Sequence, residues 1–130
     1  MPNPAGASLP NPANYTYDAA EVLDNVTGLI WERDVSGRVT STWTAATTAA
    51  TSPCTGGWRL PTRVELVSLL DFTRAPPTID TAAFPDTPGD CFWSSSLAAG
   101  SSNRAWYVRF GGGATVDSSV DTLCLVRCVR

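Results

Sequence analysis

GGWRLPTRVEL, at residues 56–66, is the stretch of sequence that decides the fold. Its second half starts a helix, because Thr62 and Glu65 have the spacing of a capping box, in which each side chain bonds the backbone N–H of the other residue. Apolar residues then recur with the helical period. We therefore predict a helix over residues 63–72, with this apolar series: Val64, Leu66, Val67, Leu69 and Leu70.

The residues before this motif predict two short strands and another helix. Residues 21–34 contain apolar stretches on either side of a turn at residues 24–28. Residues 41–53 are rich in alanine and threonine, and either Ser41 or Thr42 can serve as an N-cap. We expect a short helix there.

The residues after the motif predict a loop and then an antiparallel meander. Residues 73–90 hold four prolines and no sustained period, which indicates a functional loop or a loop packed on the core. Strands are expected at residues 92–95, 105–110 and 123–130, the last preceded by a hairpin that starts at residues 111–113. The order of elements predicts an α+β fold, with the helices packed on one side of a sheet.

Composition limits the classes of protein to consider. The 130 residues are 43% hydrophobic and 16% charged, which suits one folded domain, and we assign residues 1–17 to a linker and residues 18–130 to the domain. The net charge of −3 and the absence of a basic run argue against nucleic acid as a partner. The chain has no histidine, and hence no imidazole base, so we do not expect an enzyme.

The N-terminal part resembles neither a signal peptide nor a membrane span. Residues 1–14 are rich in proline, asparagine and alanine, and no stretch approaches the roughly 20 apolar residues that cross a bilayer. We therefore expect no membrane insertion, and a natural protein that is longer than this chain.

The four cysteines, Cys54, Cys91, Cys124 and Cys128, predict two disulfides and an oxidising compartment. On a strand, Cys124 and Cys128 would have Cα atoms about 13 Å apart, at about 3.3 Å per residue. A disulfide needs about 4.4 to 6.8 Å between Cα atoms, so these two do not pair with each other. Two of the three connectivities remain open.

Five motifs, in order, resemble a known family. They are DNVTGLIWE at residues 24–32, GGWRLPTRVEL at 56–66, FWSSS at 92–96, AWYVRF at 105–110 and VRCVR at 126–130. Together they are similar to the C-terminal domain of bacterial collagen-like adhesins. The resemblance implies a C-type-lectin-like fold with adjacent N- and C-terminal strands, and a secreted or surface protein. It also implies the pairs Cys54–Cys128 and Cys91–Cys124.

The aromatic residues of these motifs have a structural interpretation. We expect Trp31, Trp58, Trp93 and Trp106 to lie in the core, because tryptophans beside strands are usually buried. In the strand at residues 105–110, Trp106 shares one face with Val108 and Phe110, while Tyr107 and Arg109 face away from that side. Arg59 and Glu65 are expected to be structural.

The residues predicted to bind a ligand are those left on the outer surface. They are Ser102, Asn103, Arg104, Tyr107 and Arg109, whose types supply anchors and adaptable hydrogen bonds in binding surfaces. We expect no cofactor and no metal. Calcium is the alternative, since Asp80, Asp86 and Asp90 in the long loop offer carboxylates, although the sequence triplets of calcium-dependent lectins are absent.

These features favour an adhesin or receptor-binding tip that recognises a glycan or cell-surface protein through its loops, without catalysis. One alternative is a structural cap of a fibre or stalk, which trimerises through the region upstream. Another is a copper or thiol enzyme of the formylglycine-generating type, because Cys124 and Cys128 are close in sequence near the C-terminus. On a strand, however, their separation is too great for one metal ion.

Overall fold

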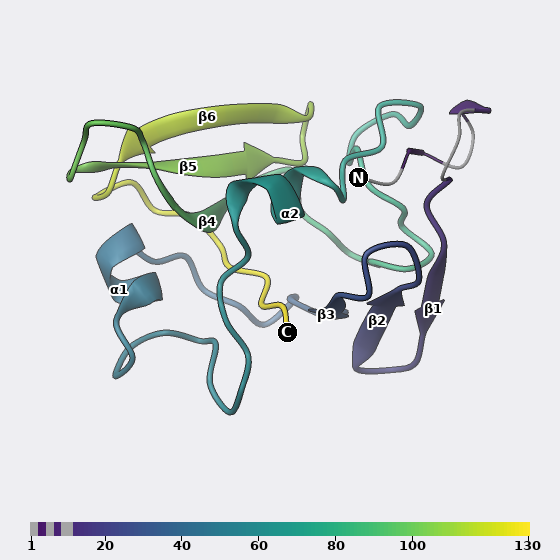
Figure 1. Ribbon diagram of the computed structural model, residues 1–130, viewed down its shortest axis with the longest axis horizontal. Helices are drawn as coiled ribbons and strands as arrows, with labels where there is room; N and C mark the ends of the chain where they lie inside the picture. Colours follow the sequence, from purple (N-terminus) through teal and green to yellow (C-terminus); the bar gives the residue numbers. More distant parts are fainter. Residues whose placement is uncertain (1–2, 5–6, 9–11) are drawn as a thin grey trace.

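The computed structural model describes residues 3–4, 7–8 and 12–130. Its elements are an α+β arrangement of two short helices and two antiparallel three-stranded sheets (Figure 1). The bounds, in chain order, are β1 (Tyr15–Tyr17), β2 (Glu21–Asp24), β3 (Ile30–Glu32), α1 (Trp43–Thr47), α2 (Arg63–Val67), β4 (Cys91–Leu97), β5 (Arg104–Arg109) and β6 (Ala114–Ser119). Within the described residues, none of the helices has the length and apolar character needed to cross a membrane.

The first sheet has the order β1-β2-β3 and contains both strands predicted within residues 21–34. Val22 pairs with Trp31, and both side chains are fully buried. The turn between β2 and β3 forms because Asp24 Oδ1 accepts the backbone N–H of Val26, at 2.9 Å. Gly28 closes it at a φ of 79°, a left-handed conformation that glycine adopts without a steric penalty.

The second sheet has the order β4-β5-β6 and confirms the strands expected near residues 92–95 and 105–110. Trp93 pairs with Tyr107, and Trp106 pairs with Asp117. The register shifts between Trp93 and Leu97, so β4 bends before it enters the loop that leads to β5. The hairpin expected after residues 111–113 supplies β6.

The C-terminal segment corrects the prediction of a strand at residues 123–130. It makes isolated bridges with several partners: Cys124 with Ser41, Leu125 with Phe92, and Val129 with Trp31 and Arg59. All of residues 124–129 are buried, whereas a strand with one exposed face would alternate. The segment therefore passes through the interior from the second sheet to the first, where its end lies beside β3 (Figure 1).

Both helices begin where the sequence predicts, and α2 ends earlier. Thr42 caps α1 by accepting the N–H of Ala45 at 3.2 Å, and Thr62 caps α2 within a capping box. The helix predicted over residues 63–72 stops at Val67, because the next amides bond carbonyls three residues back. This tighter turn directs the chain away from the helix axis before the proline-rich loop.

The interior divides into two clusters of buried residues. The large core contains Val22, Trp31, Val35, Leu66, Leu69, Leu70, Ile79, Ala83, Phe84, Phe92, Val108, Phe110, Leu125 and Val129. The disulfide core contains Ala46, Leu60, Trp93, Ala105, Cys124, Val126 and Cys128. Sheet β4-β5-β6 contributes to both, since alternate side chains of β5 face opposite ways.

Two disulfides cross-link the chain, with the pairing that the family resemblance implied. Cys54–Cys128 has a Cα–Cα distance of 5.6 Å, and Cys91–Cys124 has one of 5.1 Å. Both anchor the C-terminal segment, one to the connection between the helices and the other to β4. The connectivity that the residues left undecided is thereby settled.

The loop at residues 73–90 packs on the large core. Ile79, Ala83 and Phe84 are fully buried, and the Arg127 guanidinium lies 4.9 Å above the Phe84 ring. Arg127 is itself buried and donates to the carbonyls of residues 32 and 33 and to Thr87 Oγ1. Burial lowers the pKa of Arg127 to about 10. Part of this loop is thus a structural layer on the core, and the exposed remainder stays a candidate for recognition.

Candidate functional site

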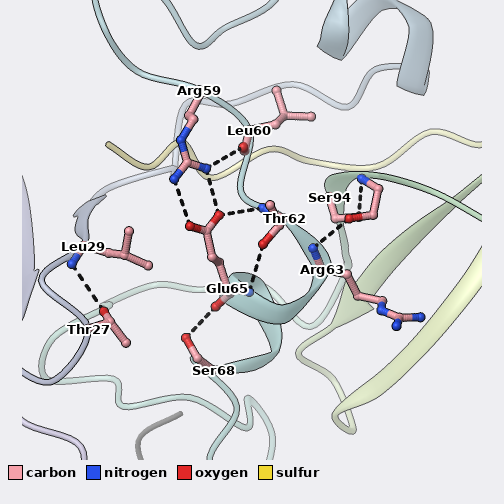
Figure 2. Close-up of polar contacts among 10 residues, drawn as sticks. Thr27, Leu29, Arg59, Leu60, Thr62, Arg63, Glu65, Ser68 and Ser94 are labelled. Atoms are coloured by element: carbon pink, nitrogen blue, oxygen red, sulfur yellow. Dashed lines mark hydrogen bonds and ion pairs between the residues drawn. The ribbon is translucent and has the colours of Figure 1, made fainter.

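The N-terminus of α2 is held by a network that joins it to the preceding segment. The Glu65 carboxylate accepts the backbone N–H of Thr62 at 2.8 Å and both terminal nitrogens of Arg59 at 2.8 Å (Figure 2). The hydrogen bond from Arg59 is the largest cause that lowers the pKa of Glu65. These two charges are therefore committed to each other, as the structural interpretation predicted.

Arg63, the first residue of α2, is placed differently. Its backbone N–H donates to Ser96 Oγ at 3.0 Å, which fixes the helix against β4. Its side chain extends away from the Glu65 carboxylate (Figure 2) and lies over the Trp106 ring, with Cζ 4.4 Å from the ring centroid. Within the part of the chain that the structure describes, no carboxylate or carbonyl accepts from this guanidinium.

A groove of about 290 Å³ lies at this position, and we name it the Arg63 groove. Its lining consists of Thr62, Arg63, Val64, Ser96, Leu97, Ala99 and Trp106. Two of the apolar side chains are open to solvent, with Val64 60% exposed and Leu97 42% exposed. The groove therefore presents the Arg63 guanidinium, which has no acceptor among the described residues, over the Trp106 ring and beside the exposed side chains of Val64 and Leu97.

The loop residues predicted to bind a ligand lie near the start of β5. Ser102, Asn103 and Arg104 are all exposed. Arg104 already has a partner, because its Nε contacts Asp117 Oδ2 at 2.8 Å and its NH2 donates to the Asp117 carbonyl at 3.0 Å. Asn103 Oδ1 accepts from Ser101 Oγ at 2.9 Å. Part of this polar set thus stabilises its own hairpin.

The other two predicted residues lie farther along β5. Tyr107 is partly buried and packs edge-on against Trp93, with ring centroids 6.0 Å apart, so it belongs to the surroundings of the disulfide core. Tyr107 is on the face opposite Val108, and a second core covers that side of the sheet. Arg109 is exposed, and it is about 17 Å from Arg104 along an extended strand, so one small ligand does not span both.

The residues missed in the sequence are those of the Arg63 groove. Trp106 was assigned to the core from its alternation with Val108 and Phe110, yet it is only partly buried, beneath Arg63. Trp58 has the same arrangement, with Arg130 4.5 Å above its ring. No local signal in the sequence links residue 63 to residue 106, because the contact depends on how α2 docks on the second sheet.

The acidic residues of the long loop do not gather. Asp80 Oδ1 accepts the N–H of Ala82 at 2.9 Å, while Asp86 and Asp90 are exposed. Among the described residues, one group could place three metal-ligand atoms together, and it is Glu32 with Cys54 and Cys128.

Those two sulfurs are bonded to each other, so they are not available as thiolate ligands. Cys124 is likewise in a disulfide, with Cys91, and the chain has no free cysteine. The copper-site alternative thereby loses the two thiols on which it depended.

The fold and the site define a class: a small α+β domain, closed by two disulfides, with an open cationic and aromatic groove and no thiol pair. Residues 20–130 match the Lcl C-terminal domain family, and the chain belongs to that family. A search of curated proteins found no match.

Proposed function

We propose that this chain is a binding module of a secreted or surface-displayed bacterial protein, an adhesin or receptor-binding tip, which recognises a glycan or cell-surface protein without catalysis. The observation that carries the proposal is the Arg63 guanidinium, held over Trp106 at 4.4 Å, in an open groove and with no acceptor among the described residues. Tryptophan and arginine are the side chains most enriched at binding hot spots.

The covalent framework supports an extracellular location. Both disulfides are formed between segments far apart in the sequence, 74 and 33 residues, and such bonds persist in oxidising compartments. The kinship with collagen-like adhesins and the C-type-lectin-like fold belong to this proposal as well. Membership of the Lcl C-terminal domain family is compatible with both.

The disposition of the charges supports recognition over chemistry. The carboxylate nearest along α2, that of Glu65, is neutralised by Arg59 and the helix N-terminus, so it is a poor general base. The residues predicted from the loop, Ser102 and Asn103, are exposed just before β5 and remain candidates for a second contact with the ligand.

Binding of the labelled chain to a glycan array and to intact cells tests the proposal. We expect a saturable signal on at least one of the two surfaces, and a loss of about tenfold in affinity for Arg63→Gln, the cost of a charge-assisted hydrogen bond. Arg130→Gln is the matched control, because it removes the same charge from an arginine that also lies over a tryptophan but is outside the groove. Silence of the folded chain on both surfaces would overturn the proposal.

A further inference from the structure

The Arg63 groove has one free charge, which restricts what it can bind. Among the described residues that line it, Arg63 is the one cation, and the paired state of Glu65 leaves the guanidinium without a free neighbour of opposite sign on α2. The chain around it carries a net charge of −3. A polyanion needs several cations to offset repulsion from such a surface, so the groove suits a ligand with a single carboxylate.

The two hydroxyl oxygens of the groove each accept one backbone N–H. Thr62 Oγ1 accepts the N–H of Glu65 at 3.3 Å, and Ser96 Oγ accepts the N–H of Arg63 at 3.0 Å. The other lining residues are apolar, with Val64 and Leu97 the most open. A neutral sugar presents many hydroxyls and would leave this apolar part of the lining facing polar groups, whereas an aliphatic side chain covers it.

An acidic peptide segment matches both features. Its carboxylate can take two parallel hydrogen bonds from the guanidinium, which lies over the Trp106 ring. An aliphatic side chain beside the carboxylate can cover Leu97 and Val64, which are exposed in the free chain. Charge complementarity and apolar burial then act at the same place.

We infer that the Arg63 groove binds an acidic–aliphatic segment of a partner protein, with a glutamate or aspartate carboxylate on Arg63 and its aliphatic neighbour on Leu97. This inference rests on the proposed function and narrows it, from a glycan or a protein to a protein ligand with one carboxylate at the contact.

A pair of peptides tests it by nuclear magnetic resonance titration of the 130-residue chain. The probes are a blocked hexapeptide with one glutamate between two leucines, and the same peptide with glutamine. We expect the glutamate peptide to shift the indole N–H of Trp106 and the side-chain signals of Arg63 and Leu97, with an affinity about tenfold higher than the glutamine peptide. Equal shifts with both peptides, or none with either, would overturn the inference.

Variants separate the groove from general charge effects. Arg63→Gln should abolish the difference between the two peptides, and Leu97→Asp should weaken the glutamate peptide by repulsion. Arg130→Gln should leave both titrations unchanged, because Arg130 lies over Trp58 and does not line the groove. If Arg63→Gln keeps the preference for glutamate, the assignment of the carboxylate to Arg63 is wrong.

A set of glycans distinguishes failure of this inference from failure of the proposed function. A sulfated or neutral oligosaccharide that shifts the Trp106 and Arg63 signals, with the peptides silent, overturns the protein ligand and leaves the binding module in place. Silence of the peptides together with silence on the glycan array and on cells overturns both.

Discussion

The two cores of the molecule are built by different means. The large core buries Trp31, Phe84, Phe92 and Phe110 completely, and no cysteine belongs to it. In the disulfide core Trp93 is the one fully buried aromatic side chain, and its other members are small or aliphatic. Each disulfide has one cysteine buried in the disulfide core, Cys128 or Cys124.

The contrast shows that apolar burial stabilises one part of this short chain and covalent cross-links stabilise the other. Apolar burial contributes about 25 cal/mol per Å² removed from water, and the large core has more buried members and more large aromatic ones. The disulfide core has fewer buried members, and only one of them is a large aromatic side chain. A cross-link stabilises such a region by lowering the entropy of the unfolded chain. The two cores should therefore respond to different substitutions.

Removal of Cys54–Cys128 should have the largest effect. The bond spans 74 residues, so the double variant Cys54→Ser, Cys128→Ser should lose about 4 kcal/mol of unfolding free energy in urea. Hydrogen exchange should show α1 losing protection before the first sheet does. The matched variant without Cys91–Cys124, which spans 33 residues, should lose about 0.7 kcal/mol less. Unchanged protection of α1 in both variants would refute the division into two cores.

Truncation in the large core should come next. Leu66 is fully buried on α2, and Leu66→Ala should cost about 3 kcal/mol through lost apolar contact and the cavity left behind. Val64 is on the same helix and 60% exposed, so Val64→Ala should change stability by less than about 0.5 kcal/mol. Thermal and urea unfolding measure both. Similar losses for the two variants would mean that α2 does not dock on the core as described.

Local signals explain which parts of the fold the sequence predicted. The capping box at Thr62 and Glu65 depends on residues three apart, and the turn at residues 24–28 depends on Asp24 and Gly28, so both could be recognised without tertiary information. The segment at residues 123–130 was misassigned because its burial is set by partners in four different regions. Likewise, the buried Arg127 looks like a surface residue until Phe84 is packed beneath it.

The site was harder to predict for the same reason. The sequence predicted Arg104 as a ligand-binding residue. In the structure its guanidinium forms an ion pair with the carboxylate of Asp117, thirteen residues later, because β5 and β6 are paired strands. Nothing in the local sequence marks Arg63 as a binding residue, and only the docking of α2 on the second sheet places it over Trp106. In both cases the pairing of a charge depends on strand register or helix docking, which a single sequence does not specify.

The smallest effect is expected at the boundary between the cores, where Arg59 and Glu65 join the segment that carries Leu60 to the helix that carries Leu66. Arg59 lowers the pKa of Glu65, so the unfolded chain binds the proton more readily and stability rises with pH in this range. The contribution is complete above the unfolded pKa of about 4.3 and is lost as pH falls through the lowered folded value.

Glu65→Gln should therefore lose about 1 kcal/mol at pH 7, a modest value because Arg59 is half exposed, and should approach the parent chain as the pH falls below that range. Urea unfolding at several pH values measures the difference. Asp117→Asn is the control. Arg104 also lowers the pKa of Asp117, but this ion pair lies at the surface of the second sheet and does not connect the two cores. A gap between Glu65→Gln and the parent that stays constant down to pH 2 would show that the effect comes from the cap geometry and not from the charge that bridges the two cores.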